Sequence, residues 1–369
     1  MSESVPVIPK LFQPTIVGKH ALSHRIVLAP LTRFRASKEH VPGEYALEYY
    51  SQRASVPGTL LITEAAFISP FAGGLDNVPG IWNDEQVDAW KRVTDAVHEK
   101  GSRIFVQLWA LGRGADPKVL DAEGLPYVSA SDVKLSTSDR VPRPLTTEEI
   151  KEYIDAYTNA SVNAVRAGFD GVELHGANGF LIDQFLQDVS NKRTDQYGGS
   201  VENRSRFALE IIESITKAIG AERTAIRLSP WGYVQDMRMA DVKPTFSYLV
   251  SQLAQKYSDL AYIHVVEPRV SGYIDRETQQ GESNDFLRDI WKPRRFISAG
   301  GHTRDSAFEF AERNDDLVAF GRFFISNPDL PILIAKNLPI KKGNRDTYYS
   351  PGPVGYIDYP FAEEDFAKI

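Results

Sequence analysis

The segment Arg103-Ile104-Phe105-Val106-Gln107-Leu108-Trp109 is apolar almost without interruption, and its apolar residues do not alternate with polar ones. Such a run is typical of a parallel strand that is buried on both faces. Similar runs recur along the whole chain, and together they predict eight strands. The predicted strands cover residues 25–30, 59–63, 103–109, 171–175, 225–229, 261–266, 294–298 and 317–320.

Stretches with helical spacing lie between these runs. Asn83 is a suitable cap for a helix over 84–100, in which Val87, Trp90 and Val97 share one face and Gly101 marks the end. Thr146 or Thr147 is a suitable cap for a helix over 148–167. The other predicted helices cover residues 43–54, 200–219, 244–257, 303–313 and 329–337.

Strands that alternate with helices, without a Pro/Gly-rich linker, predict an α/β fold with one domain over residues 1–369, a single (β/α)8 TIM barrel. A doubly wound sheet is the alternative, but its dinucleotide fingerprint G-x-G-x-x-G is absent. Residues 11–23 predict an N-terminal β-hairpin that turns at Gly18-Lys19 and caps the bottom of the barrel. The connection over 112–144, after the third strand, is predicted to be a loop excursion on the catalytic face.

The composition restricts the possible partners. The chain has 49 acidic and 42 basic residues and a net charge of -7. Such a surface repels phosphate backbones and anionic lipids, so we expect neither a nucleic-acid nor a membrane partner. The sequence contains no cysteine, which excludes disulfides, thiolate metal sites and a cysteine nucleophile. A reducing compartment fits this composition. Residues 1–10 do not resemble a secretory signal and residues 367–369 do not form a peroxisomal address, so we expect a cytoplasmic protein.

Two common kinds of catalytic site are not indicated. The seven histidines form no H-E-x-x-H motif, and no paired carboxylates stand at a predicted strand end, so we expect no metal site. The sequence contains no G-x-S-x-G elbow, so Ser-His-Asp catalysis is not indicated either.

Glycines end the last two predicted strands. Gly300 and Gly301 follow the seventh strand, and Gly321 and Arg322 follow the eighth. In barrels of this kind phosphate binds at this position, where glycine backbone amides approach closely and an arginine adds a forked cation. The alternative is that these glycines only make tight turns.

Planar hydrogen-bonding side chains end three other strands. Thr32, Gln107 and Arg227 could surround the polar edge of a flat heterocycle, and Arg227 would stabilise negative charge on it. An internal ion pair for Arg227 and a core hydrogen bond for Gln107 are the alternatives.

His175 and Asn178 lie at the end of the fourth predicted strand. Their i, i+3 spacing allows both side chains to donate hydrogen bonds to one carbonyl oxygen. These bonds would withdraw electron density from the carbons conjugated with that carbonyl. A purely structural histidine is the alternative.

The chain resembles the Old Yellow Enzyme family of FMN-dependent ene-reductases, in its fungal, yeast and plant branch. The resemblance extends from Leu11 to Phe361. The motifs that carry it are Ala29-Pro30-Leu31-Thr32-Arg33, Leu61-Ile62-Thr63-Glu64, Val106-Gln107-Leu108-Trp109, His175-Gly176-Ala177-Asn178-Gly179, residues 195–206 (DQYGGSVENRSR), residues 321–330 (GRFFISNPDL) and Gly355-Tyr356-Ile357-Asp358-Tyr359-Pro360.

The resemblance implies FMN as cofactor, with NADPH or NADH as reductant, and hydride transfer from flavin N5 to the β-carbon of an α,β-unsaturated carbonyl compound. His175 and Asn178 would hold the carbonyl oxygen of this small-molecule substrate. A monomer or homodimer is expected. The implied flavin-binding residues are Pro30, Leu31, Thr32, Ala65, Gln107 and Arg227 around the ring, and Gly300, Gly301, Gly321 and Arg322 at the phosphate. Trp109, Tyr273 and Tyr349 would line the substrate pocket.

One residue departs from the family pattern. Two residues after Asn178 the family has a tyrosine that gives a proton to the substrate, and this chain has Phe180. Phenylalanine has no proton to give. A flavin-dependent isomerase, or another specialised biosynthetic step, is therefore the alternative to an ene-reductase. Ala65, Leu75, Val234 and residues 271–274 also differ from family pocket residues, which concerns the substrate rather than the flavin.

Overall fold

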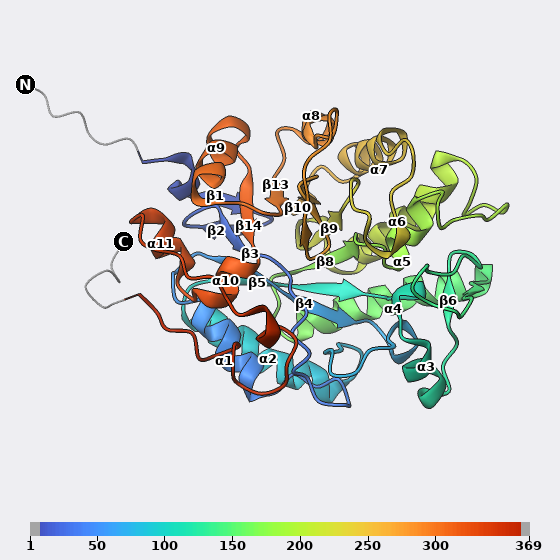
Figure 1. Ribbon diagram of the computed structural model, residues 1–369, viewed down its shortest axis with the longest axis horizontal. Helices are drawn as coiled ribbons and strands as arrows, with labels where there is room; N and C mark the ends of the chain where they lie inside the picture. Colours follow the sequence, from blue (N-terminus) through green and yellow to red (C-terminus); the bar gives the residue numbers. More distant parts are fainter. Residues whose placement is uncertain (1–7, 363–369) are drawn as a thin grey trace, which may run out of the picture.

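The barrel that the sequence predicts is present in the computed structural model, which describes residues 8–362. Eight parallel strands close on themselves in chain order, since the last strand pairs with the first (Figure 1). The strands are β3 (Ile26–Leu28), β4 (Leu60–Phe67), β5 (Arg103–Trp109), β8 (Gly171–Gly176), β9 (Thr224–Leu228), β10 (Tyr262–Val266), β13 (Phe296–Ala299) and β14 (Leu317–Phe320). All eight predicted strands are confirmed, with ends that shift by a few residues.

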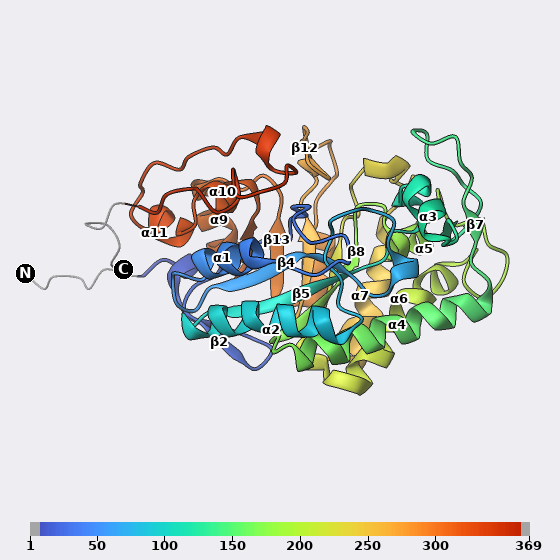
Figure 2. The ribbon, with the colours of Figure 1, turned by 90° about the horizontal axis from the view of Figure 1, so that it is seen from below.

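Helices surround the strands on the outside (Figures 1 and 2). Asn83 caps α2 as predicted, because its side chain accepts a hydrogen bond from the Gln86 amide. Thr146 caps α4 in a capping box with Glu149. The helices are α1 (Glu44–Arg53), α2 (Asp84–Glu99), α3 (Pro117–Glu123), α4 (Thr147–Arg166), α5 (Leu181–Leu186), α6 (Val201–Ile219), α7 (Lys243–Lys256), α8 (Asp285–Trp291), α9 (Arg304–Asn314), α10 (Arg322–Ser326) and α11 (Leu330–Ala335).

The seven predicted helices are confirmed, but four short ones, α3, α5, α8 and α10, were not predicted. Every residue of α5 is buried, including the polar Asp183 and Gln184, so this six-residue helix lacks the exposed polar face that gives a surface helix its period. Helices α8 and α10 span only seven and five residues, too few to establish a period.

The excursion after β5 is more ordered than the predicted loop. It contains α3 and a pair of two-residue strands, β6 (Val128–Ser129) and β7 (Arg143–Pro144). Helix α3 has a capping Asp116, a proline at its first position and Gly124 in the left-handed region at its end. These are recognisable start and stop signals, which the prediction of a loop overlooked.

A β-hairpin precedes the barrel. Strands β1 (Thr15–Val17) and β2 (His20–Leu22) pair antiparallel, as predicted. Val17 and Leu22 belong to the same buried cluster as Phe105 and Tyr262, which lie in the first halves of barrel strands. That the hairpin caps the barrel stays a prediction. A second small pair, β11 (Val270–Ser271) and β12 (Ile274–Asp275), follows β10.

The described residues contain no helix with the length and apolar character needed to cross a membrane. The predictions about a secretory signal and a peroxisomal address concern chain ends that fall largely outside the described residues, as do the outer limits of the predicted domain.

Candidate functional site

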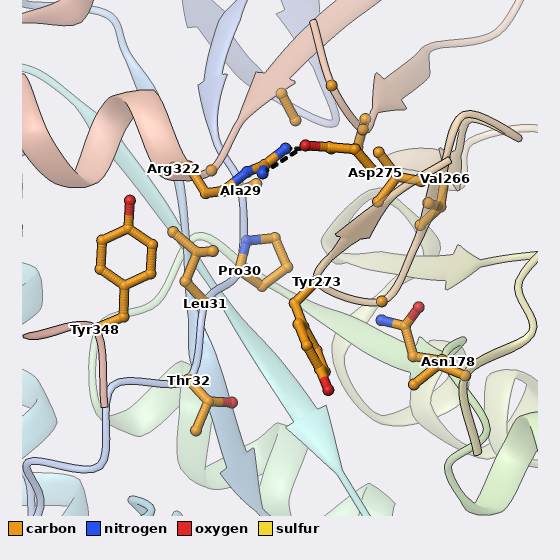
Figure 3. A pocket seen from close by; sticks show the side chains of 18 of the residues that line it. Ala29, Pro30, Leu31, Thr32, Asn178, Val266, Tyr273, Asp275, Arg322 and Tyr348 are labelled. Carbon is orange, nitrogen blue, oxygen red and sulfur yellow. Dashed lines mark hydrogen bonds and ion pairs between the residues drawn. The ribbon is translucent and has the colours of Figure 1, made fainter. Parts of the chain in front are cut away.

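A cavity of about 1070 Å³ opens at the carboxyl ends of the barrel strands. Every site residue predicted from the sequence lines this cavity except Ala65. Ala65 is buried at a register shift of β4 and packs in one cluster with Trp109 and Phe67. Figure 3 shows how the cavity is arranged: Arg322 and Asp275 lie at one end, and Asn178 and Tyr273 lie at the other.

At one end of the cavity, glycines expose the backbone to the cavity. Gly300 and Gly301 have φ values of 110° and 64°, which favour glycine. A Cβ atom on Gly321 would lie 3.1 Å from Leu31 Cδ2, so a larger residue here would press on the Leu31 side chain. The backbone amides of these turns suit an anion.

Arg322 has a carboxylate partner at this end. Its Nη1 donates to Asp275 Oδ2 at 2.8 Å, and its Nη2 donates to the other oxygen of the same carboxylate. Hydrogen bonding to Asp275 raises the pKa of Arg322, so the guanidinium is charged. A phosphate here would compete with Asp275 for the cation.

Polar side chains from neighbouring strands lie at the floor of the cavity and just below it. Gln107 Nε2 donates to Glu173 Oε1 at 2.7 Å, and His264 Nδ1 lies 2.8 Å from Glu173 Oε2. Arg227 is in register with His264 on one side and with His175 on the other. The alternative of a core hydrogen bond for Gln107 is therefore realised, yet Gln107 also lines the cavity.

The opposite end carries polar groups that have no partner. Within residues 8–362, the buried atoms His175 Nδ1, Asn178 Oδ1 and Trp109 Nε1 make no hydrogen bond. Burial, together with the charge of Arg227, lowers the pKa of His175 well below its ordinary value, so its imidazole is neutral at pH 7. A neutral imidazole beside a free amide can donate hydrogen bonds to one substrate oxygen.

The backbone around Asn178 is firmly held. Its amide donates to Ser229 Oγ at 2.7 Å, and Gln235 Nε2 donates to its carbonyl at 3.0 Å. The next amide, of Gly179, donates to Asp183 Oδ2 at 2.9 Å. The left-handed φ of 59° at Asn178 is thus fixed by three bonds, which points its side chain at the cavity (Figure 3).

Phe180 packs against Trp109 and against His175, one of the two predicted carbonyl-binding residues. Its ring centroid lies 4.6 Å from that of Trp109 and 4.9 Å from that of His175. The described residues that line the cavity include four tyrosines: Tyr348 is buried, whereas Tyr273, Tyr349 and Tyr233 are exposed by 63%, 53% and 43%.

Several lining residues were missed from the sequence. They come from the excursion, the loop after β9, the turn after β13 and the C-terminal segment. The main ones are Thr137, Tyr233, Gln235, Asp236, His302, Lys342, Arg345 and Tyr348. Irregular segments have no periodicity to reveal which side chains face inward. Glu173 had a usable signal, because it lies two residues before His175 and a strand's period of two puts both on one face. No group of three or more His, Cys, Asp or Glu side chains in residues 8–362 could hold a metal ion.

Comparisons with known proteins give a consistent result. Residues 10–341 match the model of the NADH:flavin oxidoreductase / NADH oxidase family. The chain is 52% identical over 362 residues to a chanoclavine-I aldehyde reductase of Penicillium roqueforti, covering 96% of this chain and 97% of that one. It is 48% identical over 372 residues to an NADP-dependent oxidoreductase of Aspergillus flavus, covering 97% of this chain and 98% of that one. The solved structure of Old Yellow Enzyme from Pichia sp. superposes with a TM-score of 0.89 at 38% identity, covering 96% of this chain and 94% of that one.

Proposed function

Because this chain belongs to the NADH:flavin oxidoreductase / NADH oxidase family, the family of Old Yellow Enzyme, we propose that its cavity reduces the activated C=C bond of α,β-unsaturated carbonyl compounds. The protein is an FMN-dependent oxidoreductase with a nicotinamide reductant. The observation that carries the proposed substrate class is that the His175 imidazole and the Asn178 side-chain amide both line the cavity after β8, with His175 Nδ1 and Asn178 Oδ1 unbonded, so that the imidazole N–H and the amide NH2 can donate to a substrate oxygen.

The residues present fit FMN. The cavity offers turns with glycine-specific backbone at one end and a side-chain amide with a guanidinium on its floor. The buried Arg227 Nε has no partner within the described chain, so this arginine can serve an anionic ring. FMN, when bound here, would supply hydride chemistry between the nicotinamide reductant and the β-carbon of the alkene. The ring would be held by Pro30, Leu31, Thr32, Gln107 and Arg227, and the phosphate by Gly300, Gly301, Gly321 and Arg322. That Ala65 also borders the ring stays a prediction of the sequence, since Ala65 does not line the cavity.

The substrate end then has a defined task. The neutral His175 and Asn178 donate hydrogen bonds to the carbonyl oxygen and stabilise the enolate that forms when the β-carbon receives hydride. Trp109 provides an apolar wall that excludes water from one side of the alkene, and Tyr273 and Tyr349 border the opening. The enolate must finally be protonated, and Phe180 cannot do this. Water or the phenol of Tyr349 or Tyr273 takes that role.

A second candidate function follows from Phe180. If protonation at the α-carbon fails, hydride can return and the outcome is an isomerised alkene, as in a specialised biosynthetic step. The two outcomes differ in mass balance. A reductase consumes one reductant per substrate and its product gains two hydrogens, whereas an isomerase consumes none and its product keeps the substrate's mass.

The test is an NADPH- and NADH-consumption screen of the purified yellow protein over enones, enals, maleimides and nitroalkenes, with product identification under anaerobic conditions. We expect stoichiometric reduction of at least one carbonyl-activated alkene. A flavin-loaded protein that reduces none of them would overturn the proposed function. A cytoplasmic location and a monomeric or homodimeric state remain predictions of the sequence.

Replacing Arg322 with Ala should weaken FMN binding about tenfold, since a charge-assisted hydrogen bond to phosphate is lost from a partly exposed site. Asp275→Asn should have the opposite effect, because its carboxylate would no longer compete for the guanidinium. Both affinities are measured by titrating apoprotein with FMN and following the quenching of flavin fluorescence. Equal affinity in wild type and Arg322→Ala would remove Arg322 from the phosphate site.

Phe180→Tyr should increase the formation of nitroalkane from nitroalkenes by up to about 100-fold, the lower range of a general acid's contribution. Nitronates take protons slowly from water, so a positioned phenol matters most for them. Maleimides, which are protonated readily by solvent, should change little. The packing cost is small because only a hydroxyl is added.

Phe34→Tyr is the control for this change, because Phe34 packs on Tyr349 and is not among the lining residues. It should leave both substrate classes as in wild type. Equal nitroalkane yields from wild type and Phe180→Tyr would mean that another group already supplies the proton.

A further inference from the structure

Glu173 is a fully buried carboxylate inside the barrel, below the cavity floor. Both of its oxygens accept hydrogen bonds from side chains of other strands, one from Gln107 on β5 and one from His264 on β10. Glu173 itself does not line the cavity. Its influence on a bound molecule must therefore pass through the residues that it contacts.

The first such residue is Gln107. An ionised carboxylate only accepts hydrogen bonds, so the group that Gln107 turns toward Glu173 is its NH2. The amide oxygen of Gln107 is then left to accept a hydrogen bond from a ligand. The pyrimidine edge of a flavin carries an N–H between two carbonyls, which is the pattern that such an amide matches. Without Glu173, Gln107 could flip and present the wrong group.

A second residue, the half-buried Arg227 on the neighbouring strand β9, acts on Glu173 through its charge rather than through a direct contact. Burial alone would raise the pKa of Glu173, but His264, Arg227 and the Gln107 bond outweigh it, so its pKa lies below the ordinary value. Burial lowers the pKa of His264, with Glu173 opposing, so His264 is neutral at pH 7. Glu173 is thus the anion that offsets Arg227, and the neutral histidine only donates to it.

We propose that Glu173 is a positioning residue of the flavin site, which fixes the amide orientation of Gln107 and partly neutralises Arg227. The proposal rests on the proposed function, in which Gln107 and Arg227 contact the flavin. It assigns Glu173 two separable effects. The hydrogen bond sets the affinity for FMN, and the charge sets how strongly the anionic reduced flavin is favoured over the oxidised form.

Two substitutions separate these effects. Glu173→Gln removes the charge, so Arg227 should favour the reduced flavin more, and the ratio of FMN dissociation constants, oxidised over reduced, should rise about tenfold. That change equals a midpoint potential about 30 mV more positive for the two-electron couple. Glu173→Asp keeps the charge but withdraws it from Gln107, so it should weaken FMN binding about 3- to 10-fold with a nearly unchanged potential.

Arg227→Ala tests the direction of the charge effect on the flavin potential. Loss of the cation should make the flavin harder to reduce, so its potential should shift in the direction opposite to that of Glu173→Gln. A loosened fold would weaken both redox forms alike and would not produce opposite shifts. If Arg227→Ala leaves the potential unchanged, Arg227 is structural and the charge effect of Glu173 is overturned.

Asp170→Asn is the matched control. Asp170 precedes the same strand, is buried, and binds His98 Nε2 at 2.8 Å, but it lies at the other end of the barrel. Its loss should leave the flavin potential as in wild type. A potential in Glu173→Gln equal to that of wild type, or an equal shift in Asp170→Asn, overturns the proposal.

Potentials are measured by reductive titration of the holoprotein against a reference dye, and affinities by FMN titration of the apoprotein. If Glu173→Gln yields no folded protein, Glu173→Asp decides, since wild-type FMN affinity in that variant overturns the positioning role. A wild type that binds FMN and reduces no alkene refutes the proposed function alone, because neither measurement uses turnover.

Discussion

Replacing both His175 and Asn178 with Ala should slow enone reduction by roughly 30- to 1000-fold, while the bound flavin stays reducible by dithionite. The loss corresponds to about 2–4 kcal/mol, the typical cost of removing donors to an oxyanion in a dry site. The effect should appear in kcat as well as kcat/KM, since the hydrogen bonds strengthen as the carbonyl oxygen gains charge.

The size of this effect follows from the geometry. His175 is only 5% exposed, and burial keeps it neutral, so its hydrogen bond to the substrate does not compete with water. The backbone of Asn178 is held by Ser229 and Gln235, so no backbone rearrangement is needed to present its side chain to the substrate. Each single substitution should cost less than the double one, because the remaining donor still holds the oxygen.

His98→Ala is the matched control, because His98 pairs with Asp170 at the opposite end of the barrel. It should leave enone turnover unchanged. If the double variant turns over enones at the wild-type rate, the carbonyl does not bind at His175 and Asn178, and the proposed substrate pose is wrong.

Much of the barrel could be predicted because buried parallel strands are the strongest signal in this sequence. Residues 103–109 and 317–320 were predicted with the bounds that the structure has. Residues at strand ends were then predictable too, since strand order alone brings Thr32, Gln107, His175 and Arg227 to one edge. The position of Ala65 could not be predicted in this way, because the register shift between Ile62 and Ala65 turns β4 locally.

Other parts of the site depend on contacts between distant segments. Lys342, Arg345 and Tyr348 reach the cavity from an irregular stretch whose position is set by tertiary bonds rather than by a local pattern. One of those bonds joins Arg33 Nε to the carbonyl of Tyr348 at 3.0 Å. The pair of Arg322 with Asp275 is similar, since 47 residues separate the partners. Residue type alone predicts a cation at such a place but not its partner.

Arg53 is the clearest example of such a long-range tie. This fully buried arginine donates to the carbonyls of Phe324 and Ile325 in α10 and of Tyr356 in the C-terminal segment, at 3.3, 2.5 and 3.2 Å. It also bonds Tyr49 and Gln52 on its own helix and lies 3.7 Å from the Tyr49 ring centroid. Burial lowers its pKa to about 10, so it is still charged at pH 7.

Arg53→Met should destabilise the fold by about 3–5 kcal/mol, because several buried carbonyls lose their donor at once and each unsatisfied acceptor costs about 1–3 kcal/mol, partly offset by the removal of a buried charge. The change should also weaken FMN binding, since α10 begins at Arg322 and its Phe323 and Ile325 line the cavity. Urea unfolding of the apoprotein measures the first effect, and FMN titration measures the second. Arg92→Met is the control, because it breaks only an exposed ion pair between α2 and Glu44 on α1, the helix that carries Arg53. It should leave the stability and the FMN affinity nearly unchanged. If Arg53→Met unfolds at the wild-type urea concentration, the carbonyls must be satisfied by other donors, and Arg53 does not hold α10 and the C-terminal segment onto the barrel.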